Sequence, residues 1–127
     1  MADRVTFLGS VPDLRPYLHA ARVFALPSVE RSEAFGLVQL EAMACATPVV
    51  NTALDSGVPW VSRHGESGLT VPPRDASALA GAVRTLLDDT ALAARLGEQG
   101  RRRASTELTL ARMLEATLDV YREALAP

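Results

Sequence analysis

The chain has 127 residues, 48% of them hydrophobic, which is enough apolar material for one folded domain with a single core. A net charge of −2 and a pI near 5.6 give no general attraction to nucleic acid, so no nucleic-acid partner is expected. The single cysteine, Cys45, excludes an internal disulfide and a cysteine-rich metal site. No apolar run approaches the length of a membrane span, and the N-terminal residues lack a signal-peptide core, which favours a cytoplasmic protein.

Short apolar runs bounded by glycine and proline alternate with helical patterns along the chain. Strands are expected at 5–8, 23–26, 48–51 and 69–71. Helices are expected at 14–21, about 35–46, briefly within 57–62, after a cap at Asp75 or Ser77, at 92–102, and along a C-terminal stripe of Leu110, Met113, Leu114, Leu118, Tyr121 and Leu125. The arginine cluster 101–103 is interpreted as a solvated last helical turn that complements the helix dipole. This alternation predicts an α/β fold with a doubly wound, parallel, Rossmann-like sheet and C-terminal helices.

The most informative run is 32–44, where a turn and a glycine lead into an apolar helix between two acids. Leu37 and Leu40 fall on one face of this helix, Glu41 projects from the same face, and Gln39 is the only polar side chain opposite. A helix that is apolar all round is typical of a buried position. Glu41 is therefore expected to look into a polar cleft or to meet a cation.

Glu33 lies before this helix, in the loop 29–34 that follows a short strand. Loops beyond the carboxyl ends of strands are where open α/β sheets bind ligands. Gly36, at the helix entry, lets a ligand approach the backbone, and the first helical turn presents unpaired N–H groups with the positive end of the dipole. The pattern predicts an anion site flanked by two carboxylates, which suits a sugar nucleotide.

The run 33–50, in which seven residues separate Glu33 from Glu41, resembles the signature of retaining glycosyltransferases of the GT-B fold, family 4 (glycosyl transferases group 1). The resemblance continues through 4–9, 17–28, 57–61 and 65–73, so it covers nearly the whole chain. It implies the C-terminal, donor-binding part of such an enzyme. Residues 1–127 are accordingly expected to form one truncated nucleotide-sugar-binding domain, without the N-terminal acceptor domain of the parent.

The resemblance also implies roles for single residues. Glu33 would be the catalytic residue and would contact the donor-sugar hydroxyls, Glu41 would bond the nucleotide ribose, and Val11 would pack against the base. The distal phosphate would be bound by backbone N–H groups, those of Phe35, Gly36 and Leu37. The residues alone also allow an exposed loop acid for Glu33, a structural salt bridge for Glu41 and plain packing for Val11.

Two positions depart from the family pattern. Ala46 stands where the family usually has a glycine that ends the helix, and alanine tolerates the left-handed conformation poorly, so a strained helix end is expected. Trp60 stands where a glutamate often follows a glycine pair, so no role of that third acid is carried over.

The implied activity is transfer of a glycosyl group, with mannose as one candidate, from a nucleotide-sugar donor to a saccharide or lipid-linked acceptor with retention of configuration. Helix dipoles and cations would stabilise the leaving diphosphate, so no cofactor and no metal is expected, and neither His19 nor His64 has a second ligand at metal spacing.

The parent could contact the inner membrane peripherally, and the isolated chain is expected to be inactive. The alternatives are a non-catalytic nucleotide-sugar-binding module and a GT-B sugar-nucleotide epimerase. A phosphorylase with lysine-bound pyridoxal phosphate is disfavoured because the chain has no lysine.

Overall fold

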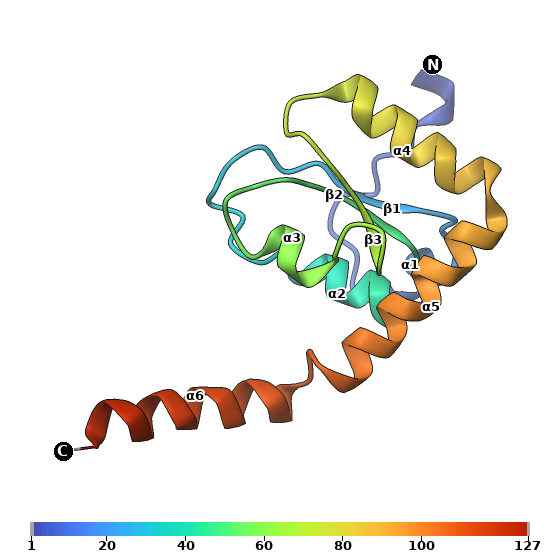
Figure 1. Ribbon diagram of the computed structural model, residues 1–127. Helices are drawn as coiled ribbons and strands as arrows, with labels where there is room; N and C mark the ends of the chain where they lie inside the picture. Colours follow the sequence, from blue (N-terminus) through green and yellow to red (C-terminus); the bar gives the residue numbers. More distant parts are fainter. Residues whose placement is uncertain (1, 127) are drawn as a thin grey trace.

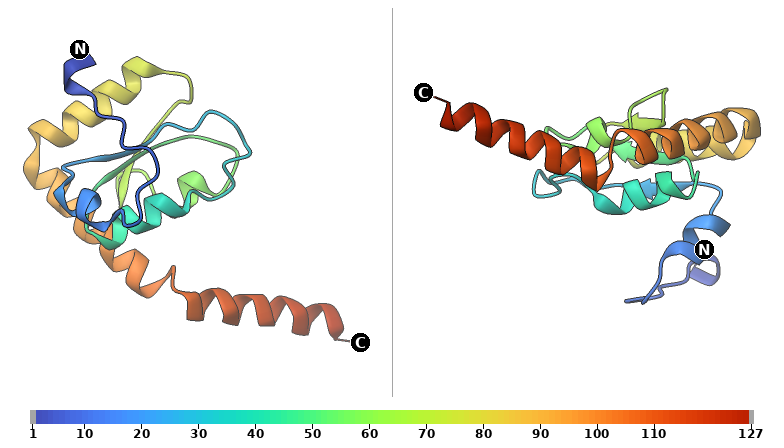
Figure 2. Two further views of the ribbon diagram at one scale, coloured as in Figure 1. Left: turned by 180° about the vertical axis from the view of Figure 1, so that it is seen from behind. Right: turned by 90° about the horizontal axis from the view of Figure 1, so that it is seen from below.

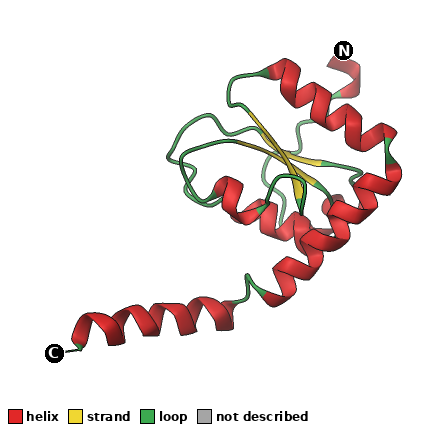
Figure 3. Ribbon diagram, in the orientation of Figure 1, coloured by secondary structure: helices red, strands yellow, loops and turns green. Residues whose placement is uncertain are grey.

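A three-stranded parallel sheet forms the centre of the computed structural model, which describes residues 2–126 (Figure 1). The strands lie in the order β1 (Phe24–Leu26), β2 (Val49–Thr52) and β3 (Gly68–Val71). Phe24 pairs with Val49, which on its other side pairs with Gly68. All four residues of the central strand β2 are buried, as expected for a parallel strand covered on both faces. The predicted parallel α/β fold is confirmed, and Figure 3 shows how short the strands are beside the helices.

Helices pack on both faces of the sheet. They are α1 (Arg15–Ala20), α2 (Leu37–Ala44), α3 (Val58–Val61), α4 (Ala76–Asp88), α5 (Thr90–Thr106) and α6 (Leu110–Leu125), and a 3-10 turn, η1, spans Ala2–Arg4. In β2, Val49 belongs to a core cluster with Leu18 of α1 and Met43 of α2. Its neighbour Val50 belongs to a second cluster with Leu86 of α4 and Leu96 of α5. Successive strand residues point to opposite faces, so β2 joins two cores.

Side-chain caps explain where three helices begin. The Asp75 carboxylate accepts from the Ala78 N–H at 2.8 Å, which settles the choice between Asp75 and Ser77 at the start of α4. Asp89 caps α5 in the same way, and Thr109 caps α6. At the end of α2, Ala46 has a φ of 58°, so the expected strain at this helix end is confirmed.

The predicted strand at 5–8 is wrong. These residues have no regular structure and are exposed, and Phe7 retains 94% of its accessible surface. Among residues 2–126 the sheet consists of β1, β2 and β3 alone, and none of them bonds to 5–8. An apolar run takes up strand structure only where a neighbouring strand accepts its backbone hydrogen bonds, so this segment stays irregular.

The last helix, α6, extends away from the body of the domain (Figures 1 and 2). None of its described residues is buried. Its apolar stripe is therefore exposed, with Leu110 at 69% and Leu118 at 52% of their accessible surface. Within residues 2–126, no helix combines the length and hydropathy that crossing a membrane requires.

Candidate functional site

The entry to α2 requires a glycine at position 36. Gly36 adopts the left-handed conformation, with φ 72° and ψ 63°. A Cβ atom there would lie 2.6 Å from Leu26 Cδ2 and 3.1 Å from Gln39 Nε2, so both the conformation and the space exclude a larger residue. Within the described chain, the N–H groups of Leu37 and Val38 have no backbone acceptor. The first turn of α2 can therefore donate to an anion.

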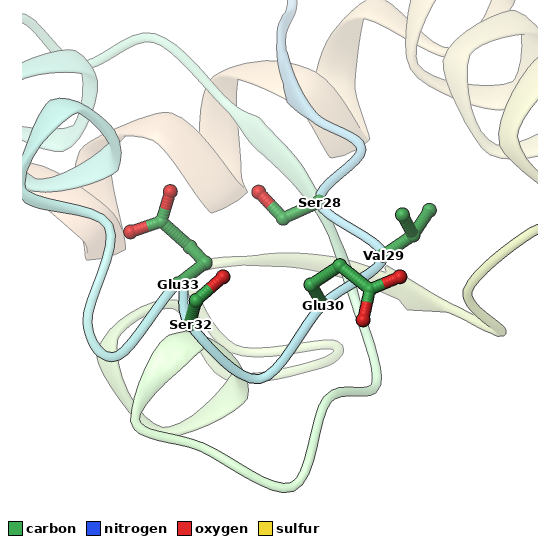
Figure 4. Close-up of a pocket in the computed structure, with 5 residues that line it drawn as sticks. All are labelled: Ser28, Val29, Glu30, Ser32 and Glu33. Carbon is green, nitrogen blue, oxygen red and sulfur yellow. The ribbon is translucent and has the colours of Figure 1, made fainter.

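A pocket of about 300 Å³ lies in the loop between β1 and α2. It is lined by Ser28, Val29, Glu30, Ser32 and Glu33. Figure 4 shows the Ser28 hydroxyl pointing to the side of the loop on which the Glu33 carboxylate lies, and the Glu30 carboxylate pointing to the opposite side. The Thr52 hydroxyl donates to the Ser28 carbonyl at 2.6 Å, which ties the start of this loop to the end of β2. The pocket thus sits at the carboxyl edge of the sheet, as predicted.

Ion pairs occupy the other charged groups of this loop. Glu30 pairs with Arg74, and Arg31 Nη2 lies 3.1 Å from Asp55 Oδ2. All four side chains are well exposed, so these pairs contribute little to stability. Among the described residues, the Glu33 side chain has no ion pair and no hydrogen bond. Its carboxylate is therefore available to a ligand.

A close backbone contact joins this loop to the loop after β2. The Gly57 N–H donates to the Ala34 carbonyl at 2.7 Å. A Cβ atom at Gly57 would lie 2.7 Å from the same oxygen, so a side chain would push the two loops apart. The loop that carries Glu33 is consequently held from the side of α3.

The helix α2 is buried on one side only, whereas its apolar sequence predicted a helix buried all round. Gln39 is fully buried, whereas Leu37 keeps 68% of its accessible surface and Glu41 is exposed. Among the described residues Glu41 meets no cation, and its expected position in a polar cleft stays a prediction. The helix turns its Gln39 side inward because that amide finds buried partners, and this leaves Glu41 on the outer side, open to solvent.

A buried polar network holds α2 against β2 and α3. The Asn51 Nδ2 atom lies within hydrogen-bonding distance of Gln39 Oε1 (3.1 Å), the Val58 carbonyl (3.1 Å) and the Ser62 carbonyl (3.0 Å). The Gln39 Nε2 atom donates to the Phe35 carbonyl at 2.7 Å. The network fixes the backbone just before Gly36. Sequence reasoning missed both amides, although each is a polar residue within an otherwise apolar element.

The predicted site residues are only partly brought together. Residues 33–36 share one loop, in which Glu33 lines the pocket, Phe35 is half-buried and Gly36 is buried. Glu41 lines neither this pocket nor a second one, which lies between Leu37, Trp60 and the start of α6, and it sits one turn along the outer side of α2 from Leu37. Val11 is half-buried in the irregular segment before α1. In the described residues no group of three histidine, cysteine, aspartate or glutamate side chains is placed to hold a metal ion.

The prediction for the arginine cluster 101–103 is wrong for one of its members. Arg103 lies in the last turn of α5, as expected, but it retains only 5% of its accessible surface and is therefore not solvated. Its guanidinium donates to the carbonyl oxygens of Trp60 and Val61. These contacts join α5 to α3.

The family profile described as "Glycosyl transferases group 1" matches residues 1–89. The chain belongs to this family. Alpha-maltose-1-phosphate synthase of Mycobacterium tuberculosis is 43% identical over 130 aligned positions, which cover 98% of this chain and 32% of that protein. The Glu33 loop is therefore interpreted as part of a group 1 chain and compared with solved structures of such chains.

Two solved structures are similar throughout. Sucrose-phosphate synthase from Thermosynechococcus elongatus superimposes with a TM-score of 0.84 and 42% identity, covering 96% of this chain and 30% of that one. HepE from Anabaena, in complex with UDP-glucose, gives a TM-score of 0.86 and 27% identity, covering 95% of this chain and 33% of that one. The group 1 chain therefore has the α/β architecture of GT-B glycosyltransferases and spans about a third of the length of these relatives.

Proposed function

We propose that this group 1 chain is the C-terminal, donor-binding half of a retaining family 4 glycosyltransferase. The whole enzyme would transfer a hexosyl group, with mannose as a candidate, from a nucleotide sugar to a saccharide or lipid-linked acceptor. One observation carries the proposal: the unpaired Glu33 carboxylate lies beside the glycine-led N-terminus of α2 at the carboxyl edge of a parallel sheet. The likeness to HepE, whose structure contains UDP-glucose, supports a nucleotide sugar as the ligand.

Each part of such a donor would meet a different group. The distal phosphate would accept hydrogen bonds from the backbone N–H groups of Phe35, Gly36 and Leu37. Glu33 would contact the sugar hydroxyls as the catalytic residue of this half. Glu41 is exposed and unpaired among the described residues, so it can accept bonds from ribose hydroxyls, and Val11 would pack against the base.

The reaction would need no metal and no cofactor. Oriented N–H groups and cations would stabilise the negative charge that develops on the departing diphosphate. The acceptor groups and the diphosphate cations would come from other segments of the parent, above all its N-terminal domain. We therefore expect no transfer by the chain alone. We also expect the parent to be cytoplasmic, with a peripheral contact at the inner membrane.

Paired titrations of Glu33→Gln and Glu41→Gln test the assignment. Both substitutions remove a charge and keep the shape, and both positions are free of ion pairs within the described chain. A charged hydrogen bond contributes about 1.5–3 kcal/mol, so Glu41→Gln should weaken UDP and UDP-glucose alike by about ten- to a hundredfold. Glu33→Gln should weaken UDP-glucose but leave UDP nearly unchanged, because UDP carries no sugar to contact Glu33.

Calorimetry with UDP, UDP-glucose, GDP and GDP-mannose identifies the base and the sugar. Equal losses of UDP or GDP affinity in the two variants, or no loss for a folded Glu41→Gln, would contradict the two roles. Sugar transfer by the chain alone, above a Glu33→Ala and Glu41→Ala control, would refute its expected inactivity. Binding without turnover in the intact parent would favour the non-catalytic module.

A further inference from the structure

Arg103 connects three structural elements from a buried position. Its Nε atom donates to the Val61 carbonyl at 3.1 Å, Nη2 donates to the Trp60 carbonyl at 3.0 Å, and Nη1 donates to the Glu107 carboxylate. Val61 and Trp60 end the short helix α3, whose last carbonyl oxygens have no partner inside the helix. A planar guanidinium satisfies all these acceptors at once, which an ammonium group cannot do with the same geometry.

The same guanidinium also supports an aromatic contact that reaches the Glu33 loop. Arg103 Cζ lies 5.1 Å from the centroid of the Trp60 ring, within the range of a cation–π interaction. The Trp60 ring in turn meets Phe35, with 6.2 Å between the centroids and 51° between the ring planes. Trp60 keeps 53% of its accessible surface, and these two contacts join it to α5 and to the Glu33 loop.

The backbone of α3 touches the same loop at a second point. Gly57, directly before α3, donates to the Ala34 carbonyl, and Val58 accepts from the Gln39 amide that also holds the Phe35 carbonyl. Arg103 holds the other end of this four-residue helix. A shift of α3 would therefore move the Ala34 and Phe35 backbone, on either side of which lie Glu33 and Gly36.

We propose that Arg103 is a positioning residue of the donor site. Acting through Trp60 and α3, it holds residues 33–36 where the Glu33 carboxylate and the N-terminus of α2 face a single ligand. The identity of that ligand, a nucleoside-diphosphate sugar, rests on the proposed function. The positioning of the loop does not, because it concerns contacts within the free chain.

The first measurement needs no ligand. Amide hydrogen exchange is compared in the wild type, Arg103→Lys and the matched control Arg102→Lys, whose side chain is exposed at the next position of α5. Loss of a charge-assisted contact should speed exchange of the Gly57 amide, which bonds to Ala34, by about tenfold or more in Arg103→Lys only. Amides of the buried strand β2 should exchange as in the wild type, which separates local loosening from global unfolding.

Trp60→Leu keeps an apolar side chain at an exposed position, so it tests the aromatic contact in a variant expected to fold even where Arg103→Lys does not. Arg103→Lys and Trp60→Leu should each weaken UDP-glucose binding by about tenfold. The double variant should be no weaker than the weaker single variant, because both changes break one line of contacts.

Multiplying effects in the double variant, or a Gly57 amide that exchanges equally fast in Arg103→Lys and Arg102→Lys, would overturn the inference. The inference would also be overturned if Trp60→Leu changed neither the exchange rate of the Gly57 amide nor the affinity for UDP-glucose. If the wild type binds none of the tested nucleotide sugars, the proposed function fails, while the exchange rates still decide whether Arg103 positions the loop.

Discussion

Replacing Asn51 by leucine should destabilise the domain strongly. The change keeps the approximate volume and removes the Nδ2 donor from two buried acceptors, Gln39 Oε1 and the Ser62 carbonyl. The Val58 carbonyl keeps its bond from Gln39 Nε2 at 3.1 Å. Each buried polar atom left without a partner costs about 1–3 kcal/mol, so the two together cost about 4 kcal/mol. Small proteins are stable by only about 5–15 kcal/mol, so this is a large fraction.

Urea unfolding, followed by circular dichroism and by the fluorescence of the single tryptophan, measures the loss. With a denaturant slope of about 2 kcal/mol per molar, the midpoint of Asn51→Leu should fall by roughly 2 M. Gln39→Leu should also destabilise, because it leaves the Phe35 carbonyl without its donor. The matched control is Gln99→Leu, which alters an exposed amide that, among residues 2–126, accepts a hydrogen bond from Arg95 alone.

In the double variant Gln39→Leu with Asn51→Leu, Gln39 Oε1 is removed together with its donor, but the Val58 carbonyl, which each single variant keeps bonded, loses both of its donors. One unpaired acceptor disappears and another is created, so the cost of the double variant should equal the sum of the single costs to within about 1 kcal/mol. A cost more than about 2 kcal/mol away from that sum would contradict these bonding assignments. A loss below about 1 kcal/mol for Asn51→Leu alone would refute the claim that its buried partners have no substitute.

Three further predictions follow from particular residues. Ala46→Gly should raise the free energy of unfolding by about 1 kcal/mol, since Ala46 has a φ of 58°, and an unchanged urea midpoint would contradict this. Hydrogen bonds from the Arg15 side chain and then from its backbone N–H lower the pKa of Asp13 from 3.8 to about 2; the stability that these bonds add is present above pH 3.8 and is lost as the pH falls toward 2. An NMR titration of the Asp13 carboxyl should show this low pKa and its rise toward 3.8 in Arg15→Ala, which removes the side-chain bonds and keeps the bond from the backbone N–H of residue 15. The exposed apolar stripe of α6 should make the chain associate at high concentration, and Leu114→Glu with Leu118→Glu should reduce the association; a compact monodisperse monomer of the unmodified chain in X-ray scattering would count against it.

Local rules in the sequence determined much of this protein. Apolar runs bounded by proline and glycine located β1, β2 and β3, because strand ends depend on residues that stop backbone pairing nearby. The pair Asp75 and Ser77 marked the start of α4, with the structure selecting Asp75, and Ala46 marked the strained end of α2, since both effects act within a few residues. The left-handed Gly36 and a pocket beside Glu33 also follow from a local pattern, a glycine-led helix entry after a strand, and the ligand predicted for this place stays a prediction.

Only the tertiary structure decided which side of each element is buried. The run 5–8 has strand-like residues but no paired strand, and a ladder needs two partners. Gln39 is buried and Glu41 exposed because Asn51, twelve residues away from Gln39, completes the amide network. Arg103 looks like one of three equivalent surface arginines until α5 brings it onto α3, some 42 residues earlier in the chain. Hydrogen-bond partners that are distant in sequence leave no local pattern, so packing alone determines which polar side chains are buried.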